Sequence, residues 1–218
     1  MPQKIKAILF DFDGVLRDSR SAIWQAFEHT LNVHGVKPAP SRNDLQPYIH
    51  HHKHVHREFA NHVSLDDFLI AYDAKLVELW DTMKAYDGAS EAVKQLYGKG
   101  YKIALVTSAR RSKGLLADMG ILEYFETIVG GNDTEEHKPH PEPVLLALAR
   151  LGMDPDEAIM IGDMDADVLA AQAAGVRHTI AILDGLGTKD TLEAAGAEYI
   201  IDSVKDVVKT VERIEHES

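Results

Sequence analysis

Short runs of aliphatic and β-branched residues alternate along this chain with amphipathic stretches that stop at glycine. Parallel strands need a crossover of a dozen or more residues, usually a helix, so this alternation is typical of a parallel sheet covered by helices. The expected strands are residues 6–10, 102–106, 125–129, 158–161, 178–182 and 199–201. The expected helices are residues 90–98, 112–119, 141–151, 165–174, 188–195 and 204–214. The predicted fold class is α/β, with helices on both faces of the sheet.

Glycine directly follows four of the helical patterns. The residue after a helix often takes a left-handed backbone conformation, which glycine accepts at little steric cost. The four positions are Gly120, Gly152, Gly175 and Gly196. We therefore expect each of these helices to end at its glycine.

One connection is too long for a simple crossover, because 67 residues separate Leu16 from Lys84. A loop of that length inside a compact domain is better explained as a domain of its own. The segment has helical periodicity at Leu65, Phe68, Leu69, Tyr72, Leu76 and Leu79. Ser64 and Asp67 have the spacing of a capping box at the start of that helix. We expect a core of residues 1–16 and 84–218 and a helical-bundle insert of residues 17–83.

Composition narrows the class of partner. The formal net charge of −12 disfavours nucleic acid, because nucleic-acid binding needs basic patches that neutralise phosphates. The chain has no cysteine, which excludes disulfides and thiol catalysis. No apolar run approaches the roughly 20 residues of a membrane span, and the short charged start does not resemble a signal peptide. We expect a cytoplasmic protein that binds neither nucleic acid nor membrane.

Reactive side chains follow four of the expected strands. Asp11 and Asp13 come directly after residues 6–10, and two carboxylates this close need a cation or a shared proton. The other residues of this kind are Thr107, Ser108, Lys138, Asp163 and Asp167. The carboxyl ends of parallel strands meet at one edge of the sheet, where α/β enzymes bind their ligands. We expect these side chains to converge there.

Taken singly, each residue has an ordinary structural explanation. Thr107 and Ser108 could cap the next helix, Lys138 could lie in a solvated loop, and acids favour a helix start. Taken together, they suit phosphoryl transfer. Carboxylates hold Mg²⁺ while a lysine and a hydroxyl bind phosphate oxygens, and one aspartate can attack phosphorus while its neighbour moves protons.

Four segments resemble the four motifs of the haloacid dehalogenase superfamily. They are DFDGVLRDS at residues 11–19, VTSA at 106–109, KPHPEP at 138–143 and GDMDADVLAA at 162–171. Within that superfamily, the chain resembles the phosphoglycolate phosphatase and β-phosphoglucomutase-like subgroup with a helical cap. The resemblance implies a Rossmann-like catalytic core with an inserted helical cap, and it covers the whole core.

The resemblance also implies roles for the first aspartates and the metal ligands. Asp11 would be the nucleophile that forms an aspartyl-phosphate. Asp13 would protonate the leaving oxygen and later activate water. Mg²⁺ would be held by Asp11, by the backbone carbonyl of Asp13 and by Asp163.

The remaining motif residues would bind phosphate or support those that do. Thr107 and the backbone N–H of Ser108 would bind phosphoryl oxygens, and Lys138 would pair with the nucleophile and the phosphate. Asp167 would contact Lys138 or a water on the metal.

Differences within the motifs separate the chemistries of the superfamily. A halide leaving group needs no acid, so Asp13 argues against a dehalogenase. β-Phosphoglucomutases have a cap histidine ten positions after the second aspartate, where this chain has Ile23. Phosphonatases use a lysine early in the insert, and none lies between Arg17 and Val36. A phosphatase agrees best with these residues.

The insert also contains a histidine-rich run at residues 50–56. On a helix, His50 and His54 would share a face at metal-ligand spacing. The run is interpreted first as a polar surface, then as a substrate contact, and last as a second metal site. Arg110 could reach an anionic substrate or lie in a solvated helical turn.

The sequence therefore predicts a Mg²⁺-dependent phosphomonoesterase. Its substrate would be a small phosphorylated metabolite, such as phosphoglycolate or a sugar phosphate, and the protein would be a monomer or homodimer. One alternative is a phosphosugar mutase like β-phosphoglucomutase. A second is a catalytically silent protein that binds phosphate or metal.

Overall fold

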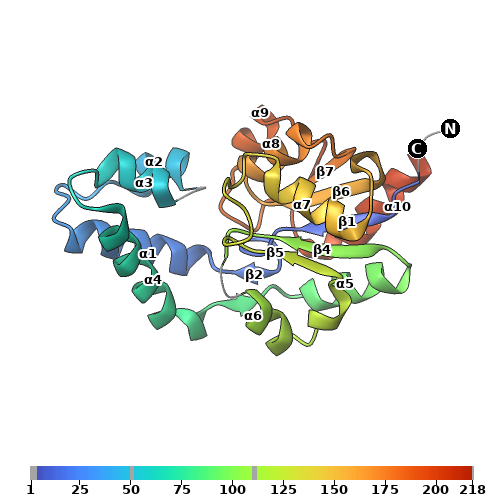
Figure 1. The fold of residues 1–218 in the computed structure, drawn as a ribbon, viewed down its shortest axis with the longest axis horizontal. Helices are drawn as coiled ribbons and strands as arrows, with labels where there is room; N and C mark the ends of the chain where they lie inside the picture. Colours follow the sequence, from blue (N-terminus) through green and yellow to red (C-terminus); the bar gives the residue numbers. More distant parts are fainter. Residues whose placement is uncertain (1–3, 50–51, 110–111, 218) are drawn as a thin grey trace. The chain divides into compact units, whose positions relative to one another are not determined.

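The computed structural model describes residues 4–49, 52–109 and 112–217. The chain divides into two compact units, of which the first combines Met1–Asp18 with Ala85–Ser218 and the second is Ser19–Lys84. The first unit contains a large sheet covered by helices, and the second unit is helical (Figure 1).

The sheet of the first unit has six parallel strands in the order β5-β4-β1-β6-β7-β8. Their bounds are Ala7–Phe10 (β1), Lys102–Val106 (β4), Thr127–Val129 (β5), Ala158–Gly162 (β6), His178–Ile182 (β7) and Tyr199–Ile201 (β8). The predicted parallel sheet is confirmed. The chain builds outward from β1 through β4 to β5 and then returns to the other side of β1 as β6. A crevice at such a reversal is the usual ligand site of this architecture.

The helices of the first unit follow the strands as expected. They are Ala89–Gly98 (α5), Ser112–Asp118 (α6), Glu142–Leu151 (α7), Asp165–Ala173 (α8), Lys189–Ala194 (α9) and Val207–Glu217 (α10). Five of them match the predicted ranges to within one residue at each end. The last differs, because Val204–Asp206 forms a 3-10 turn before α10 begins. The backbone N–H of Lys205 donates to the side chain of Ser203 at the start of that turn.

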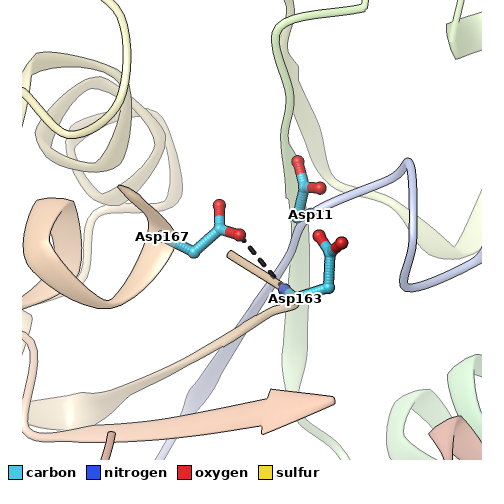
Figure 2. A group of neighbouring side chains, drawn as sticks. All are labelled: Asp11, Asp163 and Asp167. Carbon is cyan, nitrogen blue, oxygen red and sulfur yellow. Dashed lines mark hydrogen bonds between the residues drawn. The ribbon is translucent and has the colours of Figure 1, made fainter. Parts of the chain in front are cut away.

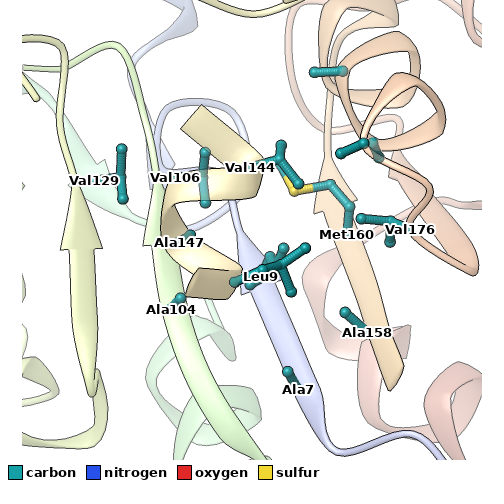
Figure 3. Close-up of a cluster of buried hydrophobic side chains, with 14 of the residues drawn as sticks. Ala7, Leu9, Ala104, Val106, Val129, Val144, Ala147, Ala158, Met160 and Val176 are labelled. Atoms are coloured by element: carbon teal, nitrogen blue, oxygen red, sulfur yellow. The ribbon is translucent and has the colours of Figure 1, made fainter. Parts of the chain in front are cut away.

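The core lies on both faces of the sheet. On one face Leu9, Val106 and Met160 belong to a cluster that continues into α7 and α8 (Figure 3). On the other face Ile8 and Leu105, which alternate with those residues along the strands, are also fully buried. A strand buried on both faces needs apolar residues throughout, which explains the continuous apolar runs of the sequence.

The predicted glycine caps are confirmed. Gly120, Gly152, Gly175 and Gly196 have φ angles of +65°, +65°, +78° and +81°. This left-handed region is rarely open to other residues, so each glycine ends its helix.

The second unit contains four α-helices within the described residues: Arg20–Val33 (α1), Arg42–Leu45 (α2), His52–Phe59 (α3) and Leu65–Glu78 (α4). The rings of Phe27 on α1 and Tyr72 on α4 lie 4.6 Å apart. Of the predicted capping box of α4, the Ser64 half is present, because the backbone N–H of Asp67 donates to Ser64 Oγ at 3.1 Å, while the Asp67 carboxylate accepts from the Ser64 hydroxyl at 2.7 Å. Helices α2 and α3 are too short to show clear periodicity in the sequence.

Two two-residue strands, Arg17–Asp18 (β2) and Lys84–Ala85 (β3), pair as a second small sheet. They stand where the chain passes between the units. Within residues 4–49, 52–109 and 112–217, every helix falls short of the length and apolar character that a membrane span requires.

Candidate active site

The site begins where β1 ends. The backbone N–H of Asp11 donates to the carbonyl of Ile161 at 2.8 Å, which continues the pairing of β1 with β6. The chain then turns at Gly14, whose φ is +85°. A Cβ at Gly14 would lie 2.1 Å from Asp163 Oδ2, so a larger residue would displace that carboxylate. Glycine is therefore required here both for the turn and for the close approach of Asp163.

Three aspartates meet at this edge. One carboxylate oxygen each from Asp11, Asp163 and Asp167 lies within 4.8 Å of the others, and all three residues are buried. Figure 2 shows them converging from the ends of β1 and β6 and from the first turn of α8. Within the described residues, this is the one group of acidic or histidine side chains close enough to hold a metal ion.

Lys138 joins this group from the connection between β5 and α7. Its Nζ donates to Asp11 Oδ1 at 2.7 Å, to Asp167 Oδ1 and to the carbonyl of Val106 at 3.0 Å. Its side chain is only 8% exposed. The ammonium therefore has three fixed acceptors, and it links Asp11, directly after β1, to Asp167 on α8.

The charges of Asp11, Asp163, Asp167 and Lys138 do not balance without a further cation. Three ionised carboxylates and one ammonium leave a net charge of −2. Burial raises the pKa of Asp11 to about 7, against the lowering effect of Lys138. Burial also raises the pKa of Asp163 well above its ordinary value, and the charge of Asp167 adds to this. These acids would ionise more readily beside a divalent cation.

Lys138 remains cationic in this arrangement. Burial alone would lower the pKa of Lys138, but the charges of Asp11 and Asp167 outweigh burial and raise it. The lysine therefore carries a permanent positive charge beside Asp11.

A loop after β7 orients Asp163. The backbone N–H of Leu186 donates to Asp163 Oδ2 at 2.7 Å, and that of Gly187 donates to the Asp163 carbonyl at 3.1 Å. A Cβ at Gly185 would lie 2.0 Å from Asp163 Oδ2, and one at Gly187 would lie 2.1 Å from the Asp163 carbonyl oxygen. Both glycines therefore allow the loop to pack directly on Asp163. The role of this loop was not predicted from the sequence. The signal that could have indicated it is the two glycines just after β7, which ends at the same edge of the sheet.

Asp167 is held by the backbone that leads into its own helix. Its Oδ2 accepts the backbone N–H groups of Asp163 at 3.1 Å and Met164 at 3.0 Å, while Oδ1 accepts from Lys138. A Cβ at Gly162 would lie 2.3 Å from the Asp167 Cβ, so glycine makes room for this side chain. Asp167 therefore both caps α8 and fixes Lys138.

Thr107 and Ser108 follow β4, the strand next to β1. Thr107 is buried, and its Oγ1 accepts the backbone N–H of Ala109 at 3.0 Å. The hydroxyl proton of Thr107 is then available for a second bond. Ser108 is exposed.

Asp13 has a different partner from the other site aspartates. Its Oδ1 accepts from Arg17 Nε at 2.9 Å and from Arg17 Nη2 at 2.5 Å. Its side chain lies outside the group of three carboxylates, and the sequence-based metal set named Asp13 for its backbone carbonyl. Arg17 belongs to the first motif but was given no role from the sequence, because nothing in the spacing shows which way its side chain points.

Three further residues were predicted from the sequence. Arg110 and His50 are outside the described residues. His54 is half-buried on α3 in the second unit. Their roles stay predictions.

The model of the haloacid dehalogenase-like hydrolase family matches residues 8–182. The chain belongs to this family. The match spans β1, the motif strands and β7, so it covers the site side chains from Asp11 to Asp167 but ends before the loop at residues 184–187. The family and the fold class predicted from the sequence are therefore confirmed, and the chain is a hydrolase.

Curated relatives of similar length match nearly the whole chain. The chain is 32% identical over 217 residues to a pyrophosphatase PpaX of Bacillus mycoides, which covers 97% of this chain and 99% of the relative. It is 34% identical over 210 residues to a pyrophosphatase PpaX of Bacillus velezensis, and this alignment covers 94% of this chain and 96% of the relative. Among solved structures, CbbY of Rhodobacter sphaeroides in complex with phosphate is 25% identical, with a TM-score of 0.78 and coverage of 93% and 96%.

Proposed function

We propose that this hydrolase is a Mg²⁺-dependent phosphomonoesterase that acts on a small phosphorylated metabolite. The observation that carries the proposal is the buried Lys138, which bonds Asp11 and Asp167 beside Asp163. A cation and three carboxylates in one buried group suit the binding of a metal ion and a phosphoryl group together. Apolar residues of similar volume would stabilise the fold as well or better, so the fold itself does not require these charges.

The donor set fits a divalent cation. Asp11, Asp163 and the backbone carbonyl of Asp13 would hold it, and all are hard oxygen ligands of the kind that Mg²⁺ prefers. When bound, the ion would supply positive charge to offset the carboxylates and the phosphate oxygens.

The reaction would proceed in two steps on Asp11. In the first, a carboxylate oxygen of Asp11 attacks phosphorus, the bond from phosphorus to the leaving oxygen breaks, and Asp13 gives its proton to that oxygen. In the second, Asp13 takes a proton from water, the water oxygen attacks phosphorus, and phosphate leaves Asp11. Asp11 and Asp13 return to their starting states.

Lys138, Thr107 and Ser108 would position the phosphoryl group. Lys138 already bonds Asp11 Oδ1 and would hold a phosphoryl oxygen near the nucleophile. The Thr107 hydroxyl accepts from Ala109 and so keeps a proton to donate, and the Ser108 backbone N–H would be a second donor. Such fixed donors favour the charge that builds up as the phosphoryl group moves.

A second substrate class is favoured by the relatives. Two proteins that match nearly the whole chain at 32% and 34% identity are named as pyrophosphatases. In pyrophosphate the leaving group is itself phosphate, and the same nucleophile and acid would serve. Pyrophosphate therefore belongs beside phosphoglycolate and sugar phosphates among the candidate substrates.

The domain division expected from the sequence is part of the proposal. Residues 1–16 and 84–218 would form the catalytic core and residues 17–83 a helical cap domain. All side chains given a role above belong to the core.

The test is phosphate release from a panel of phosphate monoesters and pyrophosphate, with Mg²⁺ and with a chelator. We expect release only with Mg²⁺. Asp11→Asn should lower it by at least about 10³-fold, because losing a covalent nucleophile has effects of this scale.

The matched control is Asp190→Asn, which changes an exposed aspartate on α9 and should leave turnover at the wild-type rate. Equal release by wild type and Asp11→Asn from every substrate would show that the catalytic assignment is wrong. Conversion of a sugar phosphate to its isomer without phosphate release would support the mutase instead.

A further inference from the structure

Arg17 is a buried arginine beside the site that the steps above do not use. Arg17 is 6% exposed, and its guanidinium lies over the ring of Phe12, 5.0 Å from the ring centroid. Two of its nitrogens, Nε and Nη2, donate to the same oxygen of Asp13, Oδ1. A buried arginine with two bonds to one carboxylate oxygen holds that carboxylate in a defined orientation.

The backbone of Arg17 is tied to the same turn. Its N–H donates to the Phe12 carbonyl at 3.1 Å, and its carbonyl accepts the N–H of Gly14 at 2.8 Å. Phe12 is fully buried and anchors this turn in the core. The turn therefore fixes the backbone of Arg17, and Asp13, which lies in the same turn, binds its guanidinium.

The two buried cations serve different aspartates. Lys138 bonds Asp11 and Asp167, whereas Arg17 bonds Asp13. The Asp13 side chain is 23% exposed and that of Asp11 is 10% exposed, so Asp13 is the more open of the two to an approaching molecule. The division keeps the nucleophile and the second aspartate in separate ion pairs.

We propose that Arg17 is a positioning residue for Asp13. By binding Oδ1, Arg17 fixes the carboxylate so that Oδ2 is the oxygen that carries the proton to the leaving group and takes it back from water. This inference rests on the proposed function, because it assigns a partner to the acid of that reaction. An arginine that only stabilised the turn would not affect one class of leaving group more than another.

The leaving group therefore provides the test. An alkyl phosphate releases a basic alkoxide that needs a proton, whereas p-nitrophenyl phosphate releases a phenolate that leaves without one. We compare kcat/KM, which includes only the steps through release of the alcohol. Arg17→Gln should lower kcat/KM for the alkyl ester by about 10- to 100-fold, within the range that a general acid contributes. For p-nitrophenyl phosphate the loss should be less than about threefold.

The second readout concerns the proton taken back from water. After phosphorylation by acetyl phosphate, whose leaving group also needs no proton, the phospho-enzyme of Arg17→Gln should decay several-fold more slowly than that of wild type. Arg17→Lys keeps a positive charge but lacks the planar fork, and it should recover part of the loss on the alkyl ester. If Arg17→Gln does not fold, Arg17→Lys provides the comparison of the two esters.

The control is Arg213→Gln, because Arg213 is an exposed arginine on α10 that also pairs with an acid and lies over an aromatic ring. It should match wild type on both esters. Equal losses on both esters, or none, in Arg17→Gln and Arg17→Lys would overturn the inference. Activity retained by Asp11→Asn would instead refute the proposed function, so the two failures are distinguishable.

Discussion

At the scale of single residues, Lys138 decides the charge balance of the site. It is the cation that bonds both Asp11 and Asp167, and it comes from a connection far from both in the sequence. Removing one partner of a buried ion pair leaves the other charges uncompensated, which costs more than the pair itself contributes. The stability of this edge and its proposed chemistry therefore depend on the same side chain.

Lys138→Met is expected to destabilise the protein by about 3–5 kcal/mol at neutral pH in the absence of metal, because the two buried carboxylates that Lys138 bonds would lose their cation. Denaturant unfolding in the presence of a chelator measures this. The control is Lys189→Met, which removes an exposed lysine on α9 and should change stability by less than about 0.5 kcal/mol. Equal stability of Lys138→Met and wild type would contradict the role of Lys138 in balancing these charges.

At the scale of elements, the loop from Asp184 to Gly187 determines how Asp163 is presented. Leu186 donates its backbone N–H to one carboxylate oxygen of Asp163, and two glycines remove the side chains that would block the contact. The contact comes from the backbone, so the identity of the residue at 186 matters less than the path of the loop. Partners that orient a metal ligand usually affect metal affinity strongly.

Gly185→Ala is therefore expected to raise the Mg²⁺ concentration needed for half-maximal activity by about 10- to 100-fold. The added Cβ would lie 2.0 Å from Asp163 Oδ2 and would displace the carboxylate. Activity titrations with Mg²⁺ measure the shift. Gly114→Ala is the control, because that glycine lies in α6 with nothing within 4 Å of an added Cβ. An unchanged Mg²⁺ requirement in Gly185→Ala would argue against the role of the loop.

At the scale of the whole molecule, the residues that would hold Mg²⁺ and phosphate in the proposed function all belong to the first unit. A ligand that binds the folded state stabilises the unit that contains its site. Metal binding should therefore affect the two units unequally, and unfolding experiments on the full chain can detect this.

We expect Mg²⁺ at about 100 times its dissociation constant to raise the melting temperature of the first unit by roughly 5–10 °C relative to chelator. Any separate transition of Ser19–Lys84 should stay in place. Calorimetry at matched ionic strength measures both. Asp163→Asn should remove most of the rise, whereas Asp190→Asn should keep it. A melting temperature independent of Mg²⁺ in wild type would speak against a metal site at the three aspartates.

Much of the fold could be predicted because the spacing of apolar residues along the chain indicates which segments are buried. The strands at residues 102–106, 178–182 and 199–201 match the structure at both ends, since apolar runs and flanking glycines mark them clearly. The pair β2 and β3 and the short helices α2 and α3 were not predicted. The strands β2 and β3 have only two residues each, and no glycine marks the ends of α2 or α3 as it does for the short elements of the core.

The sequence by itself determined which reactive residues stand at strand ends, because a parallel sheet brings those ends to one edge whatever the loops do. Asp11, Thr107 and Asp163 could be assigned to that edge on this ground. Only the tertiary structure decided the partners: Asp13 with Arg17, Lys138 with Asp167, and Asp163 with the N–H of Leu186. These pairings depend on the paths of turns and loops, which are set by close backbone approaches at glycine rather than by any periodicity along the chain.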